Sequence, residues 1–262
     1  WALPQVWGRR VHSVFFGGGT PSLFSARTIA DLIAGFRARL NLMPDCEITL
    51  EANPGSFELG KFRDFAAAGV NRLSLGIQSF DSRMLRALGR VHDGEEALRA
   101  AATAVQIFPR VNLDLMLALP QQTLEQALAD ARQALQIGAS HLSFYHLTLE
   151  PNTEFHRRPP PLPDEDSAAA IQDAVAALLH QAGFEHYETS AWAQPGQQCR
   201  HNLNYWRFGD YLGIGAGAHS KLSFAHRVIR QVRYREPKLY MDQALAGQAV
   251  AQSDEVARKD LP

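Results

Sequence analysis

Residues 72–78 read Arg-Leu-Ser-Leu-Gly-Ile-Gln, a segment in which polar and apolar residues alternate. Alternate side chains of a β-strand point to opposite faces of a sheet, so this period predicts a strand with one apolar and one polar face. Similar alternation marks three further segments. The strands predicted from the whole sequence are Ser13–Phe16, Glu47–Glu51, Arg72–Gln78, Asn112–Leu119, His141–Leu149 and, with a weaker pattern, Tyr187–Ala191.

Helical patterns separate these strands. In Ala26–Leu40 the apolar residues recur at helical spacing, and Ser25 is a suitable N-cap. Regular alternation of strands and helices predicts parallel strands joined by right-handed crossovers, and hence an α/β fold with a (β/α) barrel or part of one. The other predicted helices are Phe57–Ala68, Ser82–Leu88, Gly94–Phe108, Leu124–Ile137 and Glu165–Ala182.

The two faces of the strands predict an unusual interior. Helices cover the outside of a barrel, so the apolar faces should lie beneath them and the polar faces should point inward. An unpaired buried polar group costs about 1–3 kcal/mol, so such an interior should hold water or a polar ligand. The alternative is an internal hydrogen-bond network. The polar residues concerned are Glu51, Ser74, Gln78, Asn112 and Asp114.

Composition excludes several classes of protein. The 262 residues include 26 Lys and Arg against 27 Asp and Glu, which argues against a nucleic-acid partner. No apolar run reaches the roughly 18 residues of a membrane span, and no signal-peptide pattern is present. Cys46 and Cys199 are the only cysteines and lie far apart, so we expect a reduced, cytoplasmic protein.

A glycine-rich turn follows the first predicted strand. Residues 14–21 read Val-Phe-Phe-Gly-Gly-Gly-Thr-Pro. Backbone N–H groups of such a turn can bind a phosphate, and its carbonyl groups can receive an ammonium group. A structural turn is the alternative, and the lack of a following lysine argues against a nucleotide-binding P-loop. A barrel enzyme that binds a phosphorylated metabolite here and uses Glu51 and Asp114 as acid and base is a further hypothesis.

Several motifs together identify a family. FFGGGTPSL, EANPG, NRLSLGIQSF, LGRVH and NLDLM occur in this order between residues 15 and 116. The combination resembles the radical S-adenosylmethionine (SAM) enzymes of the oxygen-independent coproporphyrinogen oxidase group. The resemblance extends from about Val11 to Ser220 and implies a partial (β/α) barrel of the radical SAM type with a C-terminal extension.

The resemblance also implies a SAM site. Gly18, Gly19 and Thr20 match the turn that holds the methionine end of SAM. One departure follows the fourth strand, where the family has Gly-Leu-Pro-Gly-Gln and residues 118–122 read Ala-Leu-Pro-Gln-Gln. Further residues match family positions that contact SAM, or a second SAM molecule: Glu51, Gln78, Arg90 and Asp114.

The cysteine motif of the family is missing from the chain. Radical SAM proteins bind a 4Fe–4S cluster on a Cys-x3-Cys-x2-Cys loop that precedes the glycine turn. This chain begins at Trp1, so we expect it to lack the first βα unit and, as given, not to assemble the cluster or cleave SAM. The expected domains are a partial barrel over residues 1–191 and a segment over 192–262 that becomes helical from about Tyr240 and begins a truncated C-terminal domain.

The segment His201-Asn-Leu-Asn-Tyr205-Trp206 separates two branches of the family. Its HNxxYW pattern resembles the haem-binding motif of HemW-type haem chaperones, which the decarboxylating oxidases lack. The resemblance implies that His201 ligates haem iron and that Tyr205 and Trp206 contact the porphyrin. Without it, His201 would be interpreted as a structural or surface histidine. We therefore expect a haem chaperone with SAM, a cluster and haem as cofactors, haem-accepting partner proteins and a homodimer as a candidate assembly; the alternative is an oxygen-independent coproporphyrinogen III oxidase.

Overall fold

The computed structural model describes residues 2–55 and 59–257, which form two compact units. Residues Arg10–His201 make up the first, which we call the barrel unit. The second, the terminal unit, combines the N-terminal residues up to Arg9 with the segment from Asn202 onward. The barrel unit passes the predicted boundary at residue 191, because residues 191–193 pair with its main sheet.

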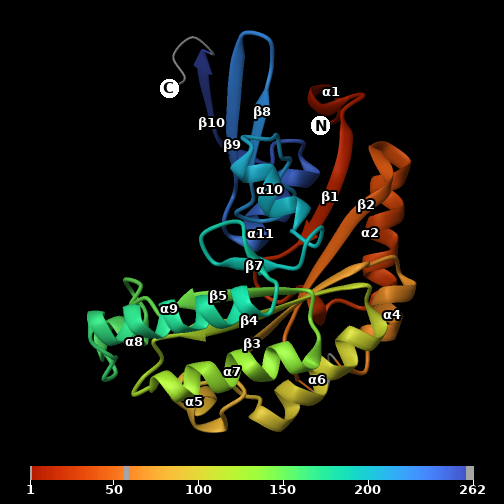
Figure 1. The fold of residues 1–262 in the computed structure, drawn as a ribbon. Helices are drawn as coiled ribbons and strands as arrows, with labels where there is room; N and C mark the ends of the chain where they lie inside the picture. Colours follow the sequence, from red (N-terminus) through yellow and green to blue (C-terminus); the bar gives the residue numbers. More distant parts are fainter. Residues whose placement is uncertain (1, 56–58, 258–262) are drawn as a thin grey trace. The chain divides into compact units, whose positions relative to one another are not determined.

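The barrel unit is built on a curled seven-stranded sheet (Figure 1). The first five strands are parallel neighbours in chain order, which confirms the predicted α/β partial barrel. A short antiparallel pair extends the sheet beyond β5. The strands are β1 (Arg10–Phe16), β2 (Asn41–Ala52), β3 (Arg72–Gln78), β4 (Arg110–Leu117), β5 (His141–His146), β6 (Glu185–His186) and β7 (Ala191–Ala193).

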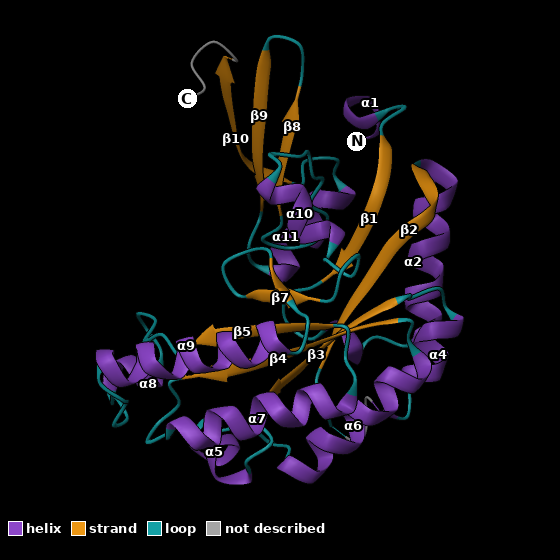
Figure 2. Ribbon diagram, viewed as in Figure 1, coloured by secondary structure: helices purple, strands orange, loops and turns teal. Residues whose placement is uncertain are grey.

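Helices of the barrel unit cover one face of the sheet (Figure 2). The Ser25 side chain accepts a hydrogen bond from Thr28 N–H and so caps α2, as predicted. The helix predicted over Phe57–Ala68 is observed from Phe62; residues 57 and 58 lie outside the described residues. The helices are η1 (Pro21–Leu23), α2 (Ala26–Arg39), α4 (Phe62–Ala67), α5 (Ser82–Ala87), α6 (Gly94–Ile107), α7 (Leu124–Ile137), α8 (Glu154–Arg157) and α9 (Glu165–Gln181).

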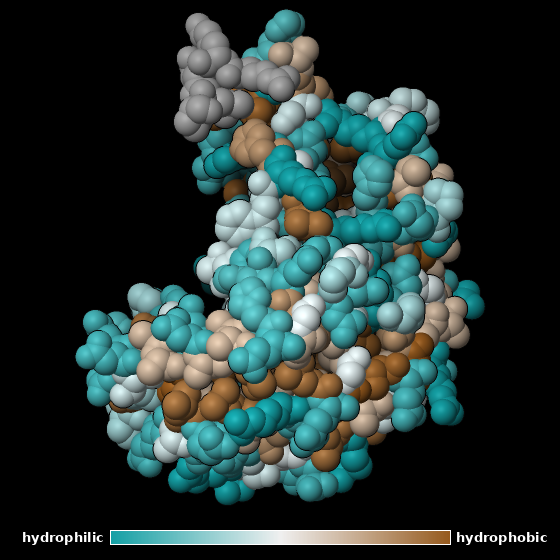
Figure 3. All heavy atoms as spheres, in the orientation of Figure 1, coloured by the Kyte–Doolittle hydropathy of each residue, from teal (hydrophilic) through white to brown (hydrophobic). Residues whose placement is uncertain are grey.

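The apolar strand faces form the core with these helices. Leu73, Leu75 and Ile77 of β3 are fully buried, as are Ala97 and Ala101 of α6. The small alanines let the helix approach the bulky strand residues closely. In the space-filling view, apolar residues gather in a band over α7 and α9 (Figure 3), two helices that pack against each other. The predicted division into apolar outer and polar inner strand faces is therefore confirmed.

The strand predicted over Tyr187–Ala191 is wrong. Residues 187–190 instead form the connection between β6 and β7. An antiparallel pair needs such a reversal, and the Tyr187 N–H donates to the Ala191 carbonyl across it. The fifth strand also ends at His146 rather than Leu149.

The terminal unit contains a three-stranded antiparallel sheet in the order β10-β9-β8. Its last strand corrects the prediction of a helix from Tyr240 onward, because α11 ends at Leu245 and β10 follows. Pairing with β9 overrides the helical preference of the Ala/Gln-rich sequence. No helix among the described residues is long and apolar enough to span a membrane. The elements are α1 (Leu3–Val6), α10 (Arg200–Trp206), which begins in the barrel unit, β8 (His219–Ser223), β9 (Arg227–Arg233), α11 (Pro237–Leu245) and β10 (Val250–Ala257).

Candidate functional site

The three glycines after β1 are needed for different reasons. Gly18 and Gly19 have φ angles of 77° and 58°, in the left-handed region that favours glycine. A Cβ atom on Gly17 would lie 2.6 Å from the Phe15 ring and 3.1 Å from Glu51 Oε2. The Gly18 N–H donates to the same carboxylate oxygen at 3.0 Å. The bare backbone therefore makes room for the Glu51 side chain.

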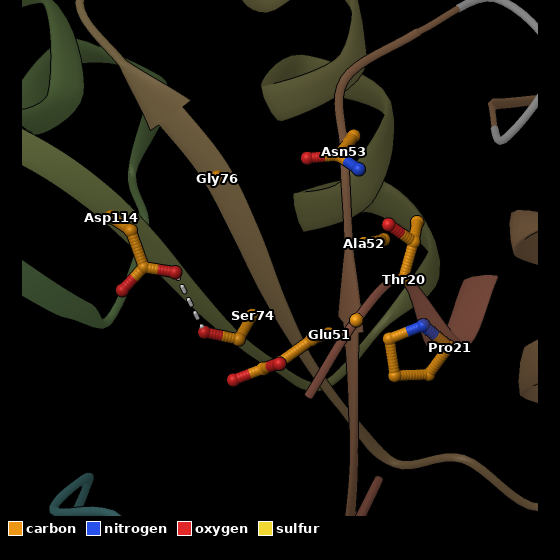
Figure 4. A pocket seen from close by; sticks show the side chains of 9 residues that line it. Thr20, Pro21, Glu51, Ala52, Asn53, Ser74, Gly76 and Asp114 are labelled. Carbon is orange, nitrogen blue, oxygen red and sulfur yellow. Dashed lines mark hydrogen bonds between the residues drawn. The ribbon is translucent and has the colours of Figure 1, made fainter. Parts of the chain in front are cut away.

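A pocket of about 120 Å³ opens beside this turn, at the carboxyl ends of the parallel strands (Figure 4). This is where parallel α/β sheets place their ligands. Of the predicted SAM residues, the structure brings Gly19, Thr20, Glu51 and Asp114 together in its lining. Prediction from sequence did not select the five other lining residues as site residues: Pro21, Ala52, Asn53, Ser74 and Gly76.

The remaining predicted SAM residues do not line the pocket. Gly18 adjoins it through its hydrogen bond to Glu51. Gln78 is buried at the end of β3 with a φ of 66°, and its Nε2 packs 3.0 Å from the position of a Cβ on Gly76. Arg90 follows α5 and is exposed. The roles assigned to Gln78 and Arg90 by the resemblance stay predictions.

Two carboxyl groups give the pocket its chemistry. Asp114 accepts hydrogen bonds from Ser74 Oγ at 3.0 Å and from Asn112 Nδ2 at 2.8 Å. Burial raises the pKa of Asp114 in spite of these bonds. Burial also raises the pKa of Glu51, against the effect of the Gly18 N–H. Carboxyl oxygens at the wall of a small pocket suit a ligand with amine or hydroxyl donors.

The polar interior below the pocket is a hydrogen-bond network, so the alternative considered from sequence holds for this part. Asn112 Oδ1 accepts from Ser143 Oγ at 3.0 Å and lies 2.6 Å from His141 Nδ1. His141 Nε2 lies 2.7 Å from the Tyr187 hydroxyl, which accepts from the Cys199 N–H at 3.2 Å. Burial lowers the pKa of His141 well below its usual value, so it is a neutral link in this chain.

Glu47 holds the start of the helix that carries His201, and prediction from sequence did not select it. Its Oε1 accepts from the backbone N–H of Arg200 at 2.9 Å and of His201 at 3.4 Å, at the start of α10. Its Oε2 lies 2.9 Å from Arg110 NH1, and the carboxylate is almost completely buried. The alternation of residues in β2 could have indicated Glu47, because it shares the polar strand face with Glu51. Its partner lies more than 150 residues away in sequence, however.

His201 packs inside the barrel unit. Its ring stacks on Phe15, with 4.4 Å between ring centroids and 19° between planes. Burial lowers the pKa of His201 to about 4; the charge of Arg72 acts in the same direction and Glu47 acts against it. The imidazole is therefore neutral at physiological pH. Tyr205 and Trp206 belong to the terminal unit, where their side chains are exposed and the Tyr205 ring lies 4.6 Å from that of Tyr211.

We expect Phe15→Leu to raise the pKa of His201 from about 4 toward 6.5, because the smaller side chain admits water to the imidazole. An NMR titration of the His201 ring protons measures this pKa directly. Phe16→Leu is the matched control, since Phe16 lies on the opposite face of β1 and contacts Phe36. An unchanged His201 pKa in Phe15→Leu would show that the ring does not exclude water.

The loop at residues 118–122 keeps a glycine-like backbone without glycine. Ala118 and Gln121 have φ angles of 56° and 57°. These are the two positions at which the related family has glycine. Non-glycine residues adopt this region at a cost of about 1 kcal/mol or more. The loop therefore has a backbone conformation that favours glycine, although both positions carry side chains.

Comparison with known proteins agrees with this geometry. Residues 4–134 match the model of the Radical SAM superfamily. The chain is similar to the "Heme chaperone HemW" of Escherichia coli, with 53% identity over 236 residues, which cover 89% of the chain and 62% of that protein. It is also similar to the protein of the same name from Haemophilus influenzae, with 48% identity over 97% of the chain and 66% of that protein.

A solved structure confirms the fold. The chain matches the structure titled "Coproporphyrinogen III oxidase (HemN) from Escherichia coli is a Radical SAM enzyme", with a TM-score of 0.83 and 25% identity. The match covers 98% of the chain and 62% of that protein. The chain thus spans less than two thirds of the length of each of these three proteins.

Proposed function

Because the chain belongs to the radical SAM superfamily, in the group whose curated members are named heme chaperone HemW, we propose that the protein binds haem and transfers it to haem-requiring acceptor proteins. The observation that carries the proposal is the neutral, half-buried His201 at the start of the HNxxYW segment. A neutral imidazole is the form that ligates haem iron, and the contact with Phe15 is made by the face of the ring.

Membership of the superfamily implies SAM and a 4Fe–4S cluster, and the residues described here fit the first of them. Glu51 and Asp114 would accept hydrogen bonds from the ammonium and hydroxyl groups of SAM, and the bare backbone at Gly19, next to Thr20, would admit its amino-acid end. Bound SAM supplies a cleavable sulfonium group. In our proposal the chain's own residues position this group and hold it away from bulk water.

The cluster does not fit residues of this chain. Cys46 and Cys199 are both buried, and no group of three or more His, Cys, Asp or Glu residues in the described part of the chain could hold a metal ion. The proposed haem site is separate from the cluster. It consists of His201 as the iron ligand, with Tyr205 and Trp206 as the proposed porphyrin contacts. We also propose that the protein is located in the cytoplasm and that it forms a homodimer.

Haem titration tests the function. We expect haem to give a Soret band with the protein and His201→Ala to weaken haem binding about 10-fold or more, because the iron loses its axial ligand. His226→Ala is the control, since His226 is an exposed histidine in the loop between β8 and β9. SAM affinity should be equal in all three proteins. A Soret band that is identical in wild type and His201→Ala would contradict the assignment of His201.

The likeness to coproporphyrinogen III oxidase favours a second candidate, the radical-dependent decarboxylation of a propionate side chain. The HNxxYW segment argues against it, because the resemblance places this motif in the chaperone branch. Anaerobic incubation of the full-length, cluster-reconstituted protein with coproporphyrinogen III distinguishes the two. Release of CO2 with formation of vinyl groups would support the oxidase.

A further inference from the structure

Arg72 is a buried cation with an unsatisfied hydrogen-bond donor among the described residues. It lies on the inner face of β3 and is 2% exposed. Its Nε is fully buried and has no hydrogen-bond partner among the residues that the structure describes. A buried charge without compensation is among the most unfavourable arrangements in a protein interior. Such a group in a native fold calls for a binding or catalytic explanation.

Thr49, on the neighbouring strand, also has a buried polar atom without a hydrogen-bond partner among the described residues. Its side chain is completely buried, and Oγ1 has no hydrogen-bond partner among the described residues. Thr49 and Arg72 are register partners on the parallel strands β2 and β3. Both belong to the inward-facing set, so their side chains leave neighbouring strands on the same side. Two adjacent unsatisfied donors indicate that an acceptor is needed there.

The charge of Arg72 acts to lower the pKa of the buried Asp114, but no ion pair joins these two side chains in the described part of the chain. The register partner of Arg72 on β4 is Arg110, whose guanidinium already pairs with Glu47 at 2.9 Å. Across β2, the register partner of Thr49 on β1 is Phe15, which carries no charge. The register neighbours of Arg72 in this layer thus include no acidic residue. An anion placed against Arg72 and Thr49 would give their unsatisfied donors an acceptor.

We propose that Arg72 and Thr49 bind a carboxylate of the ligand that occupies the interior of the barrel unit. Ser74 and Glu51, which line the pocket, lie two residues further along the same two strands. Two residues advance a strand by about 7 Å, so one small molecule reaches both places. Its carboxylate would contact the guanidinium, which binds this group in a planar, bidentate manner. Where the molecule also has amine or hydroxyl donors, as SAM does, these would contact Glu51 and Asp114.

Two carboxylate carriers follow from the proposed function, on which the identity of the ligand rests: a haem propionate and the amino-acid carboxylate of SAM. Sodium propionate provides a probe that is independent of both. We expect propionate to raise the melting temperature of the wild-type protein and to leave that of Arg72→Gln unchanged. Thr49→Val should show a reduced response. Arg86→Gln, on the exposed side of α5, is the control and should respond as the wild type does.

Ligand titrations then identify the source of the carboxylate. If it is a propionate, the wild type should bind haem about 10- to 100-fold more tightly than haem dimethyl ester, and Arg72→Gln should lose this preference. If it belongs to SAM, Arg72→Gln should weaken SAM binding by that factor and leave the haem preference unchanged. Absence of haem binding in every variant would refute the proposed function, while the propionate and SAM titrations would still test the site.

The variants must be folded for the ligand responses to be compared. Circular dichroism should show that Arg72→Gln has the secondary structure of the wild type. Its melting temperature without ligand should be no lower than that of the wild type, because a buried charge without an ion-pair partner has been removed. Arg72→Lys keeps the charge and should retain part of the propionate response. A propionate response in Arg72→Gln equal to that of the wild type, together with unchanged SAM and haem affinities, would overturn the proposal.

Discussion

Replacing Glu47 by alanine is expected to lower the free energy of unfolding of the barrel unit by about 3–5 kcal/mol, the usual cost of removing one partner of a buried ion pair. The substitution leaves the Arg110 guanidinium without its carboxylate. It also leaves the N–H groups of Arg200 and His201 without their acceptor, so α10 loses the contact that anchors its first turn to β2. Urea denaturation measures the effect.

Two further variants separate the contributions. Glu47→Gln keeps an acceptor for the helix N–H groups and removes only the charge, so it should destabilise less than alanine does. Asp45→Ala is the matched control: Asp45 lies on the same strand and pairs with Arg200 at 2.9 Å, but its side chain is 66% exposed. Exposed pairs contribute at most about 1 kcal/mol. Equal losses for Asp45→Ala and Glu47→Ala would contradict our account of Glu47.

Asp210→Ala should lower the free energy of unfolding of the terminal unit by about 3–5 kcal/mol, because it leaves the buried Lys221 without its carboxylate partner. The Lys221 ammonium is 3.2 Å from Asp210 Oδ1 and lies 3.6 Å from the centre of the Phe208 ring. Asp210 also accepts from the Ser223 N–H at 3.0 Å and pairs with the Arg9 guanidinium. One carboxylate thus joins the N-terminal segment to β8.

The pH dependence of this contribution has a definite sign. Burial acts to raise the pKa of Asp210, but the hydrogen bonds from Ser223 and Lys221 outweigh it and hold the pKa below its usual value of 3.8. A carboxyl group with a lowered pKa stabilises the fold above its unfolded-state pKa and loses this effect as pH falls through the folded value. The difference between wild type and Asp210→Ala should therefore be constant near neutral pH and shrink below about pH 4.

The double variant Asp210→Ala/Lys221→Met tests whether the loss of stability comes from leaving the Lys221 ammonium group without its carboxylate. Removing both charges should recover much of the loss, since replacing a buried ion pair with apolar side chains is often close to neutral. Denaturant unfolding of the four proteins gives the coupling energy. A double variant as unstable as Asp210→Ala would show that the loss comes from the Arg9 and Ser223 contacts instead.

The alternation of polar and apolar residues was enough to predict the sheet and its inner face. Residues 72–78 form β3 with the bounds that the alternation predicts, and Leu124–Ile137 is a helix with its predicted ends. These features depend on neighbours in the chain, so the sequence alone determines them. The errors occur where pairing decides instead: residues 187–190 connect two short strands, and Val250–Ala257 pairs with β9 in place of a continuing helix.

The candidate sites show the same division. The glycine turn, Glu51 and Asp114 were found from motifs, because a family motif records residues that meet at the carboxyl ends of consecutive strands. Only the tertiary structure decided that Glu47 holds the start of α10, that Phe15 stacks on His201 and that Arg72 Nε has no hydrogen-bond partner among the described residues. Partnership and burial depend on which distant segments the fold places against a side chain. The sequence thus determined which groups face the interior, and the packing of the chain determined which of them are left to bind a ligand.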